Sequence, residues 1–345
     1  MQRFKIEERN EAIQRGVNYI YRIARNRKNF RDYGPYFACF FTLIASTSRS
    51  VSLRRMVRDM GRDLVLRWKS ARSVLPADAD PETVYALVIA GCGVDHFGSR
   101  DRALKEEIRR AAKRISAQEF FGFDPITEPP PVDLPEPCSC GLQNVRGRKT
   151  CKQCKRRLTM SNRHIVWAEA LCATYWFERH GLNLEARFAD VIKWLPTLRP
   201  YPGRKNADYS EFFYMTYTVT HIVYTLNGYG LYNLSPLWLP HEFKFLRANH
   251  KEAIDLDNPD MVGEFLDSLK AFGLSDDHPI IRPGINYLLS KQNPDGSWGD
   301  SDDDIFHRFH ATWTAIDGLR DYAWRGERLS YPKLLPLLQR WARRR

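Results

Sequence analysis

The chain has 345 residues, of which 43% are hydrophobic, 13% aromatic and 27% charged. This composition excludes a disordered or fibrous protein and is sufficient for one large domain or two ordinary ones. The formal net charge of +12 favours negatively charged partners, namely nucleic acid, an anionic membrane surface or a phosphorylated ligand. A basic protein with none of these partners is an equally good interpretation.

The N-terminus and the cysteines predict a cytoplasmic protein. The first residues are charged and lack the apolar core of a signal peptide, and the longest apolar run, residues 36–45, is too short for a transmembrane segment. Four of the seven cysteines cluster at Cys138, Cys140, Cys151 and Cys154, which indicates a metal site in a reducing compartment rather than disulfides. The other three lie in apolar helical segments and are expected to be small core residues: Cys39, Cys92 and Cys172.

Helix-start signals predict six helical hairpins. Asn, Asp and Pro residues place the second helix of each hairpin at about residues 35, 81, 162, 208, 259 and 305. Four of the five intervals are 46 to 51 residues, whereas the third unit has about 35 residues more, which matches the Pro-rich and Cys-rich stretch 125–160. The second helices are apolar nearly all round and are expected to be buried, whereas the first helices have one apolar stripe and one charged face. The predicted hairpins span residues 9–48, 52–94, 101–178, 184–227, 236–272 and 278–323.

The last hairpin carries the most specific motif. Its residues are Arg282, Gly284, Tyr287, Leu288, Gln292, Gly296 and Trp298. They resemble the QW motif of squalene-hopene cyclases, other class II terpene cyclases and, more loosely, protein prenyltransferase β subunits. The resemblance implies a toroid in which outer and inner helices alternate around a cavity, and in which the Gln and Trp side chains tie each outer helix to its neighbour. A degraded copy occurs near the N-terminus, where Gly16, Asn18 and Tyr19 match at a constant offset of 268 residues.

The predicted fold is therefore all-α, an (α/α)6 toroid of six helical hairpins with a small inserted four-cysteine zinc module. The toroid occupies residues 1–124 and 161–330, the Pro-rich linker and zinc-ribbon-like insertion 125–160, and a basic tail 331–345. A stacked solenoid is the competing arrangement, but the matching first and last hairpins favour a closed ring. The tail is interpreted as a last helix packed on the ring or as a segment in peripheral membrane contact.

The cysteine spacing C-x-C-x10-C-x2-C predicts a structural Zn²⁺ site. Four thiolates fill a tetrahedral shell, so this zinc is expected to hold a small module together rather than to catalyse. The surrounding loop is basic and suits either a nucleic acid backbone or a docking surface for a protein partner, although it lacks aromatic side chains for base stacking. Its cations are Arg146, Arg148, Lys149, Lys152, Lys155, Arg156 and Arg157.

Two sets of acidic and histidine residues are candidates for catalysis. Asp302 and Asp303 belong to a D-x-D-D sequence, and the resemblance to class II terpene cyclases implies that such carboxyls supply a proton; a loop that caps the next helix or binds a divalent cation is the alternative. The second set is expected at one rim of the cavity, where the N-termini of parallel inner helices gather and where a second divalent metal could bind. This set comprises Glu211, Asp260, His307 and His310, together with Asp208, Tyr209 and His164. His221 is expected towards the opposite mouth.

These features predict a terpene-cyclase-like enzyme, a cyclase, isomerase or transferase, that acts on an apolar or isoprenoid-like small molecule in the central cavity. One alternative is a non-enzymatic toroid scaffold whose basic zinc module binds nucleic acid or a protein. The other is a metalloenzyme that uses histidines and carboxylates such as His310 and Asp260 in the same cavity.

Overall fold

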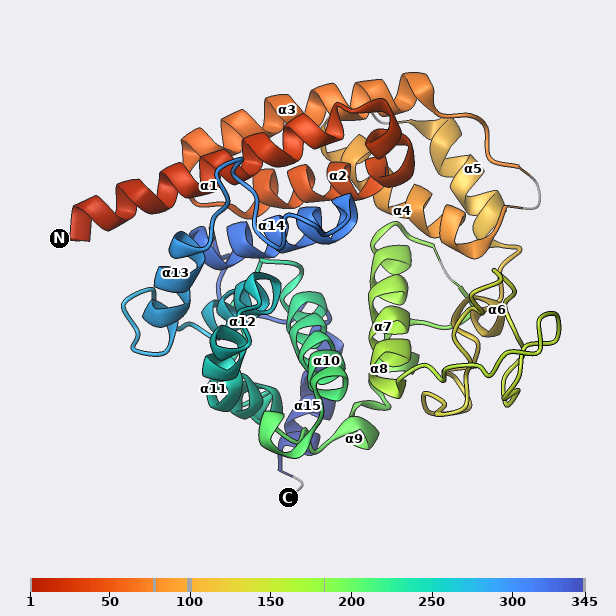
Figure 1. Cartoon of the computed structure of the whole chain (residues 1–345). Helices are drawn as coiled ribbons and strands as arrows, with labels where there is room; N and C mark the ends of the chain where they lie inside the picture. Colours follow the sequence, from red (N-terminus) through yellow and green to blue (C-terminus); the bar gives the residue numbers. More distant parts are fainter. Residues whose placement is uncertain (1, 77–78, 98–100, 183, 344–345) are drawn as a thin grey trace.

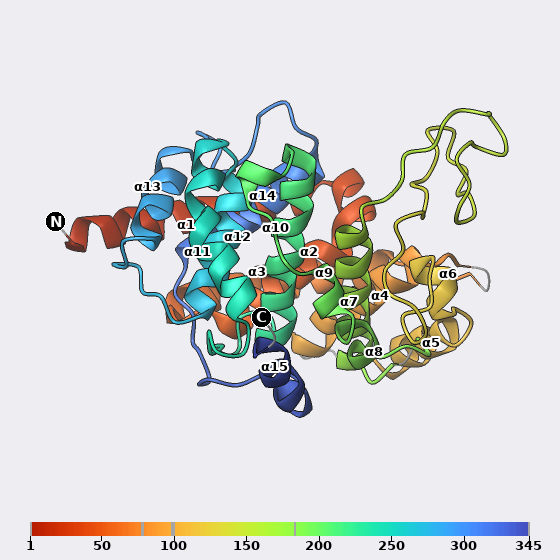
Figure 2. The ribbon, with the colours of Figure 1, turned by 90° about the horizontal axis from the view of Figure 1, so that it is seen from below.

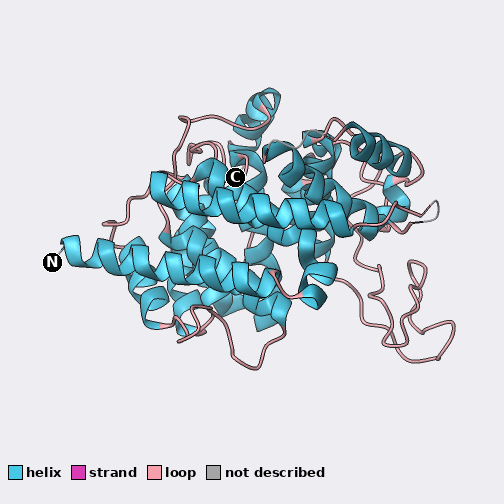
Figure 3. Cartoon of the chain, turned by 90° about the horizontal axis from the view of Figure 1, so that it is seen from above, coloured by secondary structure: helices cyan, strands magenta, loops and turns pink. Residues whose placement is uncertain are grey.

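The predicted all-α class is confirmed. The computed structural model describes residues 2–76, 79–97, 101–182 and 184–343, the first four of them by their backbone alone. Helices account for 62% of the chain, and the described ranges contain isolated β-bridges but no strand. Loops and turns join the helices throughout (Figure 3).

Six central helices contact one another in a closed cycle. They are α2 (Arg27–Thr47), α4 (Pro81–His96), α7 (Arg163–Arg179), α10 (Tyr209–Asn227), α12 (Pro259–Ala271) and α14 (Ile305–Leu319). Each contacts the next in chain order, and α14 contacts α2. The flanking helices are α1 (Gln2–Ala24), α3 (Val51–Ala71), α5 (Arg102–Ala112), α11 (Pro240–Asp255) and α13 (Ile281–Ser290). The short elements are α6 (Ala117–Phe121), α8 (Phe188–Ile192), α9 (Leu195–Leu198), η1 (Arg204–Asn206), η2 (Pro332–Leu334) and α15 (Leu335–Ala342).

The first and the last hairpin meet where α1 packs on α13 and α14 (Figure 1). Trp298 is fully buried there, and its indole Nε1 donates to the backbone oxygen of Leu288 at 2.7 Å. A Cβ atom on Gly16 of α1 would lie 2.8 Å from the Trp298 ring, so only glycine permits this approach. The side-chain amide of Gln292 donates to the backbone oxygen of Ala12 in α1 at 2.8 Å, so both Gln292 and Trp298 contact the first flanking helix.

Five of the six central helices begin where the sequence predicts, and α2 does not. Its predicted start at Gly34-Pro35 is wrong, because Asn26 already caps the helix by accepting hydrogen bonds from the backbone N–H groups of Lys28 and Asn29. Pro35 lies inside α2. The fourth hairpin also differs, since two short helices, α8 and α9, stand in place of a long flanking helix.

The insertion 125–160 projects from the helical body between α6 and α7 (Figure 2). Its base is closed by a bridge between Pro135 and Met160. It has its own apolar cluster, formed by Cys138, Cys151 and Leu158, which is distinct from the main core.

The C-terminal segment contains α15, in which Leu338 and Trp341 are buried. Residues 344–345 of the predicted tail lie outside the described residues. Among the described helices, none combines the length and the apolar character that a membrane crossing needs.

Candidate metal centres and the central cavity

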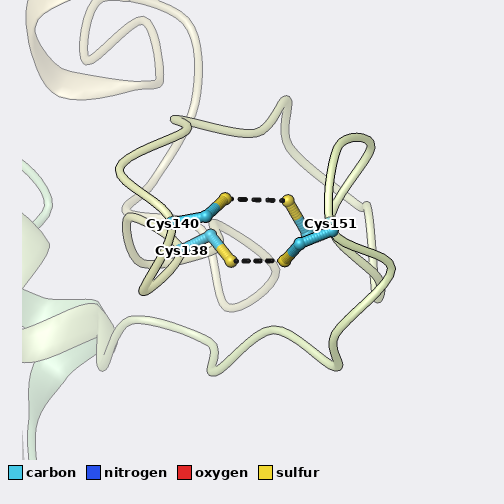
Figure 4. A group of neighbouring side chains, drawn as sticks. Cys138, Cys140 and Cys151 are labelled. Atoms are coloured by element: carbon cyan, nitrogen blue, oxygen red, sulfur yellow. Dashed lines mark hydrogen bonds between the residues drawn. The ribbon is translucent and has the colours of Figure 1, made fainter.

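The four clustered cysteines have a geometry that suits a metal ion. The Sγ atoms of Cys138 and Cys154 lie 3.4 Å apart, and those of Cys140 and Cys151 lie 3.7 Å apart (Figure 4). A disulfide requires about 2.05 Å, whereas four sulfurs about 2.3 Å from a tetrahedral Zn²⁺ lie about 3.8 Å from one another. All four sulfurs lie within 4.8 Å of one another. The site is therefore compatible with zinc.

Two tight turns hold these cysteines in place. The residue after each cysteine pair, Gly141 and Lys155, has a positive φ, at 84° and 61°. The backbone N–H of Lys155 donates to the oxygen of Cys151 at 3.1 Å. Hydrogen bonding from the backbone N–H of Cys154 lowers the pKa of the Cys151 thiol to about 6, which favours the thiolate that a metal binds.

The second candidate centre lies at the edge of a cavity of about 80 Å³ between the central helices, which Glu264 and His310 line and Asp260 does not. The carboxyl groups of Asp260 and Glu264 lie one turn apart on α12, and His310 projects from α14. One potential ligand atom from each of the three lies within 4.8 Å of the others. His310 Nδ1 is 2.9 Å from Asp260 Oδ1. The cavity is lined by Leu43, His221, Tyr224, Tyr229, Glu264, Asp267, His310, Trp313, Thr314, Asp317, Arg320 and Tyr322.

Two glycines bring α12 and α14 close enough for these contacts. A Cβ atom on Gly263 would lie 2.4 Å from the backbone of Thr314, and one on Gly318 would lie 3.1 Å from Gly263 Cα. The absence of both side chains lets the backbones approach closely. Polar side chains beside the glycines then face each other across the seam between the helices, as when Thr314 Oγ1 donates to Asp260 Oδ1 at 2.8 Å.

The three groups strongly affect one another's protonation. Burial, followed by the nearby Asp260 carboxylate, raises the pKa of Glu264 to about 8. Burial acts to lower the pKa of His310, but Asp260 outweighs it and raises that pKa to about 9. Glu264 Oε2 accepts a hydrogen bond from Thr220 Oγ1 at 2.7 Å, while Glu264 Oε1 is buried and has no partner among the described residues. A proton or a bound cation would satisfy this oxygen.

A second polar group forms the other end of the cavity. Arg320 Nε donates to Asp317 Oδ1 at 2.6 Å, and the guanidinium lies 3.8 Å from the centre of the Tyr322 ring. Asp267 Oδ1 is buried with no partner in the described part of the chain, and the Tyr322 hydroxyl faces Asp267 without a hydrogen bond of normal geometry. Burial, followed by Asp317, raises the pKa of Asp267 to about 7.

Of the six predicted catalytic residues, the structure brings together Asp260 and His310 and leaves the others elsewhere. Asp302 and Asp303 are exposed in the loop before α14. Asp304, the next residue, caps α14, because its Oδ1 accepts a hydrogen bond from the backbone N–H of His307 at 3.0 Å. The His307 side chain is exposed, and its Nδ1 lies 2.9 Å from Asp304 Oδ2. Glu211 lies half-buried in the first turn of α10.

The expectation that His221 lies at the opposite mouth is wrong, because it lines the same cavity as His310. That expectation assumed that the central helices start at one level. In the structure, Thr220, the twelfth residue of α10, contacts Glu264, the sixth residue of α12, so the two helices are staggered.

Sequence reasoning missed Glu264 and Asp267. Together with Asp260 they repeat at i, i+4 and i+7 on one face of a helix that is otherwise apolar. Three carboxyls on a buried helix face are costly unless they are partnered, and this pattern could have indicated the site.

The basic side chains of the stretch 146–157 are exposed on the projecting module, except for the half-buried Arg148, and one of them, Arg146, is neutralised. Arg146 donates to Glu128 and to Asp133, which lie outside the stretch 146–157. No salt bridge with an acid joins the remaining cations to the described residues. These six cations, called the module cations below, are Arg148, Lys149, Lys152, Lys155, Arg156 and Arg157.

Comparisons with protein-family models, with curated proteins and with solved structures found no match to this chain.

Proposed function

We propose that the chain is a metal-dependent enzyme with an (α/α)6 toroid fold, in which Asp260, Glu264 and His310 hold a divalent cation in the central cavity. The toroid is supported by the closed cycle of contacts among the six central helices and by the packing of α1 on α13 and α14. The structural zinc of the proposed enzyme is bound by the four cysteines of the insertion.

The observation that carries the catalytic proposal is the convergence of three potential ligand atoms within 4.8 Å. Metal binding would release the protons that Glu264 and His310 hold near neutral pH. The resulting two carboxylates and one imidazole are a ligand set that suits Zn²⁺, Mn²⁺ or Fe²⁺ and leaves coordination positions open for water and substrate. A bound cation also accounts for the unpartnered Glu264 Oε1. When bound, the ion would polarise a substrate oxygen or lower the pKa of a water molecule.

The chain's own residues would complete this centre. Thr314 and Thr220 orient the carboxyl groups of Asp260 and Glu264 through hydrogen bonds of 2.8 and 2.7 Å. His221 lies beside the centre as a neutral imidazole, because burial lowers its pKa to about 3. Near neutral pH its free ring nitrogen can therefore accept a hydrogen bond from a substrate, but with so low a pKa the ring is a weak base and is not expected to take up the proton.

The dimensions of the cavity favour a small polar substrate over an isoprenoid. Its volume of about 80 Å³ is below the roughly 300–1,000 Å³ of pockets that enclose drug-sized ligands. A carboxyl group with a pKa of about 8, as at Glu264, exchanges protons readily near neutral pH but holds its proton too tightly to protonate a carbon–carbon double bond. Acid-initiated cyclisation is thus the less favoured use of this cavity.

The test is metal binding by single variants, each with a matched control. Asp260→Asn, Glu264→Gln and His310→Ala should each weaken binding of Zn²⁺ or Mn²⁺ at the cavity by at least tenfold in calorimetric titration. Their controls are Asp302→Asn, Glu211→Gln and His307→Ala, which change the same residue types outside the cavity and should bind metal like the parent chain. Loss of activity in Asp302→Asn with metal binding intact would instead favour the terpene-cyclase-like mechanism.

A second candidate function, duplex nucleic acid binding, is favoured by the six module cations. They lie on a projecting surface of a chain with net charge +12 and have no acidic partner among the described residues. The stretch 146–157 has no aromatic residue for stacking on bases, so the phosphate backbone is the expected contact.

This second function is tested by the salt dependence of binding to a short DNA duplex. Neutralising Lys149, Lys152, Arg156 and Arg157 together should reduce the slope of log K against log salt by up to about 0.9 per lost phosphate contact. Arg146→Gln is the control, because Arg146 is already paired with Glu128 and Asp133. Binding to an acidic protein but not to DNA would assign the surface to a protein partner.

A further inference from the structure

The end of the cavity away from Asp260 contains buried oxygens with spare acceptor capacity. Asp267 is 6% exposed and Tyr322 is 5% exposed, and both line the cavity. Asp267 Oδ1 and the Tyr322 hydroxyl face each other, yet neither makes a hydrogen bond of normal geometry with any residue that the structure describes. The hydroxyl can donate only one hydrogen bond to the carboxyl group, and leaving the remaining acceptor capacity unused in a buried site is costly, so these atoms indicate a ligand that brings its own N–H groups.

The walls beside these acceptors are aromatic. Tyr224, Tyr229, Trp313 and Tyr322 all line the cavity. The faces of such rings attract cations, and one of them already does so, since the Arg320 guanidinium lies 3.8 Å from the centre of the Tyr322 ring. Arg320 is occupied by Asp317 through a hydrogen bond of 2.6 Å. Asp267, by contrast, forms no salt bridge within the described ranges.

We propose that Asp267, Tyr322 and the neighbouring aromatic rings bind a primary ammonium group of the substrate. A primary ammonium carries three N–H donors and a positive charge, which match two free acceptors, a carboxyl group and aromatic faces. The volume of about 80 Å³ restricts the bound group to a few heavy atoms. This inference rests on the proposed function, because it places the rest of a small amine substrate at the Asp260–Glu264–His310 centre.

Methylammonium is the smallest probe of this subsite, and acetamide is a neutral probe that also carries N–H donors. Calorimetric titration of the full chain should show saturable binding of methylammonium that is at least tenfold tighter than that of acetamide. Asp267→Asn should weaken methylammonium binding at least tenfold, and Tyr322→Phe, which removes only the hydroxyl, several-fold. Asp303→Asn is the control for an exposed carboxyl group and should bind like the parent chain.

The metal variants separate this inference from the proposed function. If His310→Ala loses the metal but still binds methylammonium, both proposals hold. If the parent chain binds no metal in the cavity yet binds methylammonium through Asp267, the catalytic proposal fails and the ammonium subsite stands. Equal affinity for methylammonium and acetamide, or unchanged methylammonium binding in both folded variants at Asp267 and Tyr322, would overturn the subsite.

Discussion

The side-chain amide of Gln292 donates a hydrogen bond to the backbone oxygen of Ala12 at 2.8 Å, across 280 residues of sequence. The same amide donates to the oxygen of Gly296 at 3.0 Å, so it also fixes the turn that leads to Trp298. Because α1 belongs to the first hairpin and α13 to the last, this contact joins the two ends of the cycle of helices. The stability of the whole fold should therefore depend on it.

Truncating the two key side chains tests this closure. Trp298→Ala should lower the free energy of unfolding by about 3–5 kcal/mol, since it removes a fully buried aromatic ring. Gln292→Ala should lower the free energy of unfolding by about 1–2 kcal/mol, because the two hydrogen bonds that its amide donates are lost. Arg282→Ala, an exposed change in the same motif, should stay within about 0.5 kcal/mol. Urea denaturation measures all three, and equal stabilities would mean that the junction does not hold the fold together.

The close contact between α12 and α14 gives a second prediction. Gly263→Ala places a Cβ atom 2.4 Å from the Thr314 backbone, which cannot move aside as a side chain can. We expect the free energy of unfolding to fall by about 1–3 kcal/mol. Metal binding should also weaken, because the helices that carry Asp260 and His310 would move apart. Gly91→Ala in α4 is the matched control within a helix: its Cβ would meet its nearest neighbour, Ile108 Cδ1, at 3.4 Å, and stability should stay equal or rise by about 0.5–1 kcal/mol. Thermal or urea unfolding and metal titration measure the two effects.

The sequence predicts the helical class, the insertion and five of the six central helix starts because each depends on local signals: caps, apolar patterning and cysteine spacing. It does not predict the cavity, because the relative heights of the helices are set by tertiary packing. The stagger that places Thr220 beside Glu264, and hence His221 beside His310, depends on which side chains interlock between α10 and α12. Asp302 and Asp303 form a recognisable motif, yet they lie in an exposed loop, whereas Glu264 and Asp267 form no known motif and lie in the cavity.

The insertion is predicted to be a separable module. Cys151→Ser should release about one zinc ion per chain and disorder the insertion, since metal binding supplies much of the folding free energy of such modules. The main melting transition should survive, because the apolar cluster around Cys138, Cys151 and Leu158 is distinct from the main core. The control is Cys172→Ala, which changes a buried cysteine outside the insertion. This variant should keep the zinc ion of the insertion. Calorimetric melting and metal analysis test this, and unfolding of the whole chain in Cys151→Ser would contradict it.

Acid should destabilise the fold partly through His180. Burial lowers the pKa of His180 from the usual 6.5 to about 4. The Asp95 carboxylate acts to raise this pKa, and the positive charges of Lys105 and Arg179 lower it further. Its Nε2 lies 2.6 Å from the Cys92 thiol, whose pKa burial raises to about 12, so that the thiol keeps its proton. The unfolded chain takes up a proton at this residue below pH 6.5 and the folded chain does not, so stability is lost as the pH falls from 6.5 to 4.

The loss of unfolding free energy from this residue is at most about 3–4 kcal/mol, because one pKa unit corresponds to about 1.36 kcal/mol. His180→Gln should reduce the fall in unfolding free energy between about pH 7 and 4.5 relative to the parent chain. An unchanged pH dependence in His180→Gln would show that this residue does not titrate as its burial implies.

The measurement that tests the central claim most directly is the number of divalent metal ions, counted as zinc, manganese and iron together, that each chain binds. We predict two in the parent chain, one in a variant in which Cys138, Cys140, Cys151 and Cys154 are all replaced by serine, and one in Glu264→Gln. The prediction for Glu264→Gln does not depend on whether the insertion stays ordered. A parent chain that binds a single metal ion, which is lost with the four cysteines and kept in Glu264→Gln, would contradict a metal centre in the cavity.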